Sequence, residues 1–188
     1  MKDQLVAESV RLFEQRGFTN TSLQDIVEAL GVTKGTFYYY FPTKEALLMT
    51  IHESYIDSLL DRQQRVLAQT KDVRTQLRHI VQLLIEDIQT HGQQGRVFFR
   101  EIRHLDEANG ARIRDKRRQF RIVLEQVIAN GVENHTFRHT LRPDMTAFAI
   151  LGMTNYSYQW YQPDGEMAPQ DLADYYVTLL LDGMEERP

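Results

Sequence analysis

Residues 17–48 read GFTNTSLQDIVEALGVTKGTFYYYFPTKEALL and contain the start and stop signals of consecutive short helices. Thr21 and Ser22 each have a polar residue three positions later, close to the arrangement of a capping box, and either can begin the first of these helices. Gly31 is predicted to end that helix, because the tight turn that follows needs a residue that tolerates positive φ. The pattern predicts a helix, a glycine turn and a second helix.

The second helix, residues 33–41, has an unusual composition for a buried element. Phe37 and Phe41 are four positions apart and are predicted to face inward. Three consecutive tyrosines, residues 38–40, cannot all face one core on a helix. Gly35 lowers helix stability, which is understandable where a backbone approaches another molecule closely. Small polar groups, a lysine and phenol hydroxyls suit the phosphate oxygens and base edges of DNA.

The rest of the chain has helical periodicity, and no segment is persuasive as a strand. Glycine, proline and polar clusters divide it. The breaks are predicted at His91-Gly92, at Asn109-Gly110, across residues 134–140 and across residues 163–169. The predicted helices in this part of the chain are 43–65, 72–90, 95–107, 110–131, 143–161 and 168–185. The predicted fold class is all-α, with about nine helices.

Residues 17–48 resemble the DNA-binding domain of TetR-family transcriptional regulators. The family pattern is D-I-A-x-x-A-G-V-S-x-G-T-x-Y-x-H/Y-F followed by S/T-K-E-x-L, and this chain meets nearly every position. Val27 replaces the usual alanine, and Leu30 stands where alanine is common. The resemblance implies a helix-turn-helix domain in residues 1–45, with its motif at about 22–41, and a ligand-binding and dimerisation domain in residues 46–188.

The resemblance also assigns the DNA contacts. The second helix of the motif is expected to enter the major groove, and a homodimer would place two such helices about 34–36 Å apart. Thr21 or Ser22, together with Lys44, would contact phosphates. The implied DNA-binding residues are Thr21, Ser22, Thr33, Lys34, Gly35, Thr36, Tyr38, Tyr39, Tyr40 and Lys44. The alternative reading treats the tyrosines as core aromatics and Lys34 as a solvated charge.

Two features suggest a small-molecule effector. The aromatic run in residues 155–161, followed by a Pro-Asp-Gly turn, resembles the ending of TetR regulators of fatty-acid and steroid degradation, whose ligands are CoA thioesters. Aromatic side chains near a dimer interface explain the same run without a ligand, and a different apolar ligand is the other alternative. The candidate ligand-binding residues are Phe98, Phe99, Arg100, Arg103, Phe120, Met153, Tyr156 and Trp160.

Charge is unevenly distributed along the chain, whose formal net charge is -4. Residues 96–121 hold nine basic and four acidic side chains, and Arg100 and Arg103 in this segment would suit the phosphates of a ligand. The alternative is a solvated helix face. Residues 1–50 hold five basic and six acidic side chains, so we expect DNA binding with a shallow salt dependence.

The last two predicted helices, 143–161 and 168–185, are apolar on two sides. A helix of this kind is buried on two sides, which in a small chain indicates a core on one side and a partner subunit on the other. The sequence therefore predicts a homodimer formed through these helices.

Catalytic and metal-binding patterns are poor. The chain has no cysteine, and His135 and His139 are four apart without a third ligand nearby. No catalytic residues, no metal and no cofactor other than the effector are expected, and the chain is not expected to be an enzyme. There is no signal peptide pattern and no run of 18 apolar residues, so a cytoplasmic protein without membrane contact is expected.

The resulting hypothesis is a cytoplasmic, homodimeric repressor of transcription that a small apolar effector, with an acyl-CoA as the named candidate, releases from operator DNA. The effector would favour a spacing of the two recognition helices that no longer fits successive major grooves. Helix 43–65 would transmit the change. A ligand-independent, chromosome-associated protein of the same fold and a helical enzyme are the alternatives.

Overall fold

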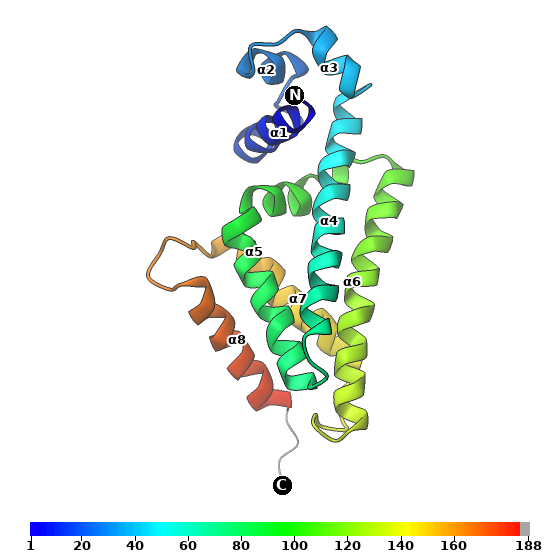
Figure 1. The fold of residues 1–188 in the computed structure, drawn as a ribbon, viewed down its shortest axis with the longest axis vertical. Helices are drawn as coiled ribbons and strands as arrows, with labels where there is room; N and C mark the ends of the chain where they lie inside the picture. Colours follow the sequence, from blue (N-terminus) through cyan, green and yellow to red (C-terminus); the bar gives the residue numbers. More distant parts are fainter. Residues whose placement is uncertain (185–188) are drawn as a thin grey trace. The chain divides into compact units, whose positions relative to one another are not determined.

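The computed structural model describes residues 1–184, and this part of the chain is helical with no strand (Figure 1). The predicted all-α class is confirmed, with eight α-helices and one short 3-10 helix among the described residues. The predicted end of the last helix, residue 185, lies outside them. The elements are α1 (Lys2–Arg16), α2 (Leu23–Ala29), α3 (Lys34–Tyr40), α4 (Lys44–Ala68), α5 (Val73–Glu101), η1 (Ile102–His104), α6 (Glu107–Glu133), α7 (Pro143–Trp160) and α8 (Pro169–Met184).

The chain divides into two compact units. The first unit combines Met1–Asp57 with Gly92–Asp115, and the second combines Ser58–His91 with the chain from Lys116 onward. The first unit extends past residue 45 because later side chains of α4 and α5 join its core. The expected functional boundary between residues 45 and 46 stays a prediction.

The core of the first unit confirms the inward orientation predicted for the two phenylalanines of α3. Phe37 is fully buried and Phe41 nearly so, and they pack with Phe13 and Ile26 in one apolar cluster. Val97, from the last part of α5, is buried in the same cluster. Each fully buried side chain of this size contributes about 1.5–3 kcal/mol to folding. Phe37 and Val97 are therefore parts of one core although they lie 60 positions apart in the sequence.

Local capping signals explain where the short helices begin and end. Ser22 and Asp25 form a complete capping box at the start of α2. Gly31 has φ 64° in the turn between α2 and α3, as the sequence predicts. Thr33 accepts a hydrogen bond from the backbone N–H of Thr36 at the start of α3.

The structure agrees with one predicted helix break and differs at another. The predicted break at His91-Gly92 coincides with a kink in α5, where His91 has non-helical φ −132° and ψ 22°. The predicted helix 95–107 is wrong at its end, because α5 stops at Glu101 and the short η1 follows. The break at Asn109-Gly110 is wrong because α6 already begins at Glu107. Asp106 caps this start, since its carboxylate accepts the backbone N–H of Asn109 at 2.9 Å and its carbonyl accepts that of Gly110 at 2.8 Å.

The second unit has an apolar core with one buried charged cluster. The carboxylate of Asp87 on α5 accepts from the hydroxyl of Tyr158 at 2.5 Å. It also contacts Arg62 at 2.5 Å and His91 at 2.9 Å. These contacts join α4, α5 and α7 within the unit.

Candidate nucleic-acid interface and effector residues

Helix α3 presents a polar and aromatic surface on the side away from its buried phenylalanine. The side chain of Tyr39 is 82% exposed and that of Tyr38 is 56% exposed, whereas Phe37 is fully buried. Tyr40 is half-buried, packs against the core, and its ring meets that of Tyr39 edge-on with centroids 4.9 Å apart. Burial of Phe37 therefore fixes which face of α3 points outward.

The first turn of α3 adds small polar groups to this surface. Lys34 and Gly35 are exposed, and a Cβ atom added to Gly35 would meet only the hydroxyl of Thr33, at 3.5 Å. The hydroxyls of Thr33 and Thr36 are 3.1 Å apart. The glycine leaves the backbone open at the start of α3, where N–H groups suit acceptors such as phosphate oxygens.

Ser22 and Thr21, the two candidates for phosphate contact before α2, differ in exposure. Ser22 is exposed, and its hydroxyl and backbone N–H hold the pKa of Asp25 below its ordinary value. Thr21 is fully buried, and its hydroxyl donates to the carbonyl of Gly17 at 2.9 Å. Burial therefore removes the Thr21 hydroxyl from the candidate surface and leaves Ser22 on it.

Lys44, also expected at phosphates, has internal partners. Its ammonium donates to the carbonyls of Phe18 at 2.8 Å and Thr21 at 2.7 Å, and it lies 4.2 Å from the centre of the Phe18 ring. Partial burial lowers the pKa of Lys44. These hydrogen bonds connect the start of α4 to the loop before α2. A DNA phosphate would have to compete with the two carbonyls for the ammonium group of Lys44.

The eight candidate effector residues divide between the two units. Phe98, Phe99, Arg100 and Arg103 belong to the first unit, and Phe120, Met153, Tyr156 and Trp160 belong to the second. Phe98 is buried against the rings of Tyr55 and His52, with centroids 4.8 and 5.3 Å apart.

In the second unit the candidates have different exposures. Phe120 is buried and Met153 is half-buried, but Tyr156 and Trp160 are 67% and 51% exposed on one face of α7. The two aromatic side chains therefore lie on the surface of this chain rather than in its core.

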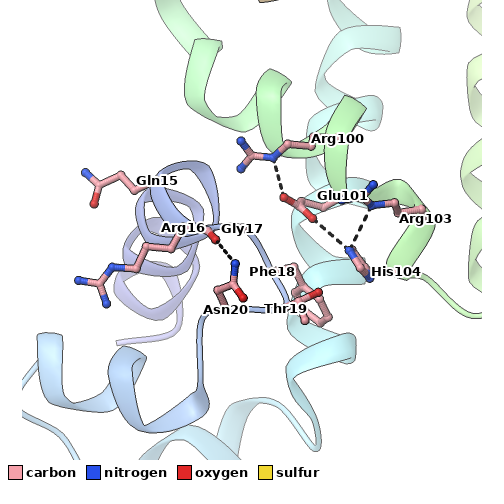
Figure 2. A pocket seen from close by; sticks show the side chains of 10 residues that line it. All are labelled: Gln15, Arg16, Gly17, Phe18, Thr19, Asn20, Arg100, Glu101, Arg103 and His104. Atoms are coloured by element: carbon pink, nitrogen blue, oxygen red, sulfur yellow. Dashed lines mark hydrogen bonds and ion pairs between the residues drawn. The ribbon is translucent and has the colours of Figure 1, made fainter.

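A polar hollow of about 310 Å³ lies in the first unit, between the carboxyl end of α1 and the end of α5 with η1 (Figure 2). Its lining residues are Gln15, Arg16, Gly17, Phe18, Thr19, Asn20, Arg100, Glu101, Arg103 and His104. Arg100 and Arg103 were predicted from the sequence to bind an effector. The sequence analysis does not predict a binding role for Arg16, Asn20 or His104. The signals that could have indicated them are the nearby Gly17 for the first two and the basic segment 96–121 for His104.

Neither a metal centre nor a membrane span is found in the described part of the chain. Across residues 1–184, no three side chains of the metal-binding types lie close enough to share an ion, and His135 occupies a turn with φ 61°. None of the described helices is both long and apolar enough to cross a membrane.

The three-helix arrangement with a glycine turn and an exposed polar helix defines a helix-turn-helix DNA-binding protein. The family model described as bacterial regulatory proteins of the tetR family matches residues 5–51, and the model described as the tetracyclin repressor-like C-terminal domain matches residues 70–184. The chain belongs to the TetR family of transcriptional regulators, which confirms the resemblance seen in residues 17–48. The members of this family are regulators and not enzymes.

Individual relatives agree with this assignment over nearly the whole chain. The transcriptional repressor KstR2 of Rhodococcus jostii is 26% identical over 185 residues, which cover 97% of this chain and 90% of the relative. The structure of a TetR-family regulator from Bordetella parapertussis is 27% identical, with a TM-score of 0.89 and coverage of 96% and 94%. AibR in complex with isovaleryl coenzyme A and operator DNA is 25% identical, with a TM-score of 0.87 and coverage of 96% and 97%.

Proposed function

We propose that this TetR regulator is a cytoplasmic, homodimeric repressor whose affinity for operator DNA is lowered by a small-molecule effector. The exposed Tyr38, Tyr39 and Lys34 on α3, held outward by the burial of Phe37, carry the DNA-binding part of the proposal. Repression is proposed because the KstR2 relatives are named as repressors. Residues 1–45 contact DNA, and residues 46–188 bind the effector and dimerise.

In the proposed complex α3 lies in the major groove. Its exposed tyrosines and Lys34 reach base edges and phosphates, while Thr33, Gly35, Thr36 and the exposed cap Ser22 approach the backbone. The first fifty residues have almost no net charge, so specific placed contacts rather than a bulk field supply the affinity.

A footprint of the wild-type protein on its own genomic DNA tests this arrangement. Two α3 helices related by a two-fold axis protect two inverted half-sites whose centres are about 10 base pairs, or a multiple of one helical turn, apart. Protection of a single asymmetric site, or of DNA without sequence preference, would contradict a dimer that reads an operator.

The homodimer is proposed to form through α7 and α8. Met145, Phe148, Tyr156 and Trp160 are large exposed side chains that follow one face of α7, and Tyr175 and Leu179 are exposed on α8. A face on which several large apolar side chains are exposed together is typical of an interaction site. Because the faces belong to the last two helices of each copy, a second copy can bury them symmetrically.

Charged substitutions test the dimer directly. We expect Phe148→Glu combined with Leu179→Glu to convert a dimer to a monomer in light scattering, while Lys71→Glu, at an exposed loop position, leaves the dimer unchanged. A double variant that stays dimeric at micromolar concentration would show that other surfaces hold the subunits together.

The effector is proposed to be a CoA thioester. The support is the aromatic run in residues 155–161, the arginines at 100 and 103, and the similarity to AibR, whose structure contains isovaleryl coenzyme A. An effector acts by binding one conformation of the dimer better than the other, which shifts the population away from the DNA-binding state. Thermal shift and native mass spectrometry with acyl-CoAs test this identity, and it fails if no acyl-CoA binds or stabilises the protein.

A further inference from the structure

The polar hollow of the first unit has an asymmetric arrangement of charge. Glu101 is among its lining residues, is 2% exposed, and is paired with the Nε of Arg100 at 2.6 Å and with the Nε2 of His104 at 3.4 Å. Arg16, Arg100 and Arg103 also line it and are exposed, with Arg16 on α1 and the other two beside Glu101 (Figure 2). The three basic side chains of the lining are therefore accessible to a solute, whereas the carboxylate is buried and paired.

Two of these arginines have little competition from acidic partners. The Nε of Arg103 lies 3.3 Å from the Nε2 of His104, and within residues 1–184 no carboxylate forms an ion pair with Arg103. Arg16 is 3.9 Å from the carboxylate of Asp25, and exposed pairs at this distance are weak. Both guanidinium groups retain donors for an incoming anion.

Besides its pair with Glu101, Arg100 has partners on α1. One of its terminal nitrogens donates to the carbonyl of Phe13 and, at 2.9 Å, to the carbonyl of Glu14. These carbonyls lie in the last turn of α1, where a cation is favourable. They are neutral acceptors, however, and a guanidinium binds a phosphate group more strongly than a carbonyl.

We propose that this hollow binds the phosphate groups of a small-molecule effector through Arg16, Arg100 and Arg103. The proposal rests on the proposed function, in which the effector is a CoA thioester. It assigns the phosphate-bearing end of that effector to the first unit, and so extends effector binding beyond residues 46–188 to Arg16 on α1. A concave site of about 310 Å³ suits a compact phosphorylated group better than the convex backbone of duplex DNA.

Phosphate binding would also act on the DNA-binding helices. Arg100 exchanges the carbonyls of Phe13 and Glu14 for the phosphate, which leaves the end of α1 less firmly held. The turn that follows α1 supplies the Phe18 and Thr21 carbonyls that hold Lys44. A change at Arg100 therefore reaches the start of α2 and of α4 through a short series of contacts.

The test titrates the full-length protein with two defined probes, inorganic pyrophosphate and coenzyme A. We expect both to bind wild type and to shift the Nε–Hε NMR signals of Arg100 and Arg103. Arg103→Gln and Arg16→Gln are each expected to weaken binding about tenfold. The matched control Arg118→Gln, an exposed arginine on α6, is expected to bind as wild type does.

A second measurement follows operator affinity with and without coenzyme A. We expect coenzyme A to weaken operator binding by wild type and to lose most of this effect in Arg103→Gln. If thermal unfolding shows that Arg103→Gln is misfolded, Arg16→Gln supplies the same comparison from α1.

Three results would overturn the phosphate site. The first is no binding of either probe to wild type at millimolar concentration. The second is equal binding by the Arg103→Gln, Arg16→Gln and Arg118→Gln variants. The third is a weaker affinity of Arg103→Gln for all DNA sequences when no probe is present, together with a weaker dependence of that affinity on salt concentration. This result would show that the hollow contacts the DNA backbone. Operator binding by wild type alone reports separately on the proposed function.

Discussion

The ammonium group of Lys44 donates a hydrogen bond to the backbone carbonyl of Thr21 at 2.7 Å, across 23 positions of sequence. A second bond reaches the carbonyl of Phe18 at 2.8 Å. The first turn of α4 is thereby attached to the loop that leads into α2. Lys44 therefore has a structural role within the protein that does not depend on contact with DNA.

Replacing Lys44 by methionine keeps most of the side-chain volume and removes both hydrogen bonds. Since the two carbonyls would lose a charged donor, we expect the free energy of unfolding to fall by about 1–3 kcal/mol in urea titrations. The same change at the exposed Lys71 serves as control and should have little effect. Equal stability of the two variants would show that the carbonyls of residues 18 and 21 need no such donor.

Two glycines near the motif should respond in opposite directions to alanine. Gly31 has φ 64°, so Gly31→Ala is expected to destabilise the fold by about 1–2 kcal/mol although no atom lies within 4 Å of the added Cβ. Gly35 lies in α3, where the new Cβ makes only an ordinary contact, so Gly35→Ala should stabilise the fold by up to about 1 kcal/mol. Thermal unfolding of both variants checks the pair, and a stabilising Gly31→Ala would contradict the assigned turn.

The helix-turn-helix was predictable because its signals are local. The Ser22 cap, the positive φ of Gly31 and the inward direction of Phe37 each depend on residues within a few positions. The predicted break at Asn109-Gly110 failed for a related reason, since the cap that matters is Asp106, which allows α6 to begin before the glycine. Where two signals compete within one turn, the sequence does not show which of them prevails.

Contacts between distant segments could not be predicted. The sequence indicates that Arg100 belongs to a basic segment, but its acceptors on α1 are 86 and 87 positions away. The burial of Thr21 and the internal partners of Lys44 likewise depend on tertiary packing. The exposure of Tyr156 and Trp160 has the same origin, because periodicity alone does not distinguish a core face from a face left for a partner.

The buried carboxylate of Asp87 should be far more important for stability than an exposed one. Asp87→Ala would remove the carboxylate that lies 2.5 Å from Arg62. We expect the free energy of unfolding to fall by about 3–5 kcal/mol. The control is Asp61→Ala, which removes an exposed pair with Arg65 and should cost less than about 1 kcal/mol. Urea denaturation measures both, and similar losses would contradict the role assigned to burial.

The capping box of α2 should contribute to acid sensitivity. Hydrogen bonds from the Ser22 hydroxyl and backbone N–H lower the pKa of Asp25 in the folded state. The ionised carboxylate therefore stabilises the fold at pH values above its unfolded-state pKa of about 3.9. This stabilisation is lost as the pH falls through the folded-state pKa. We expect Asp25→Asn to reduce the drop in Tm on acidification below about pH 4. Parallel curves for wild type and variant would exclude a measurable contribution from this carboxylate.

Specific DNA binding through the exposed face of α3 is the central claim, and fluorescence anisotropy with the footprinted operator tests it most directly. The comparison is between wild type and the variant Lys34→Ala combined with Tyr39→Ala, both confirmed as folded dimers. We expect wild type to prefer the operator over a shuffled duplex by at least about 1000-fold and the variant to lose this preference. Retention of the wild-type preference by the folded, dimeric variant would contradict the assignment of α3 as the recognition helix.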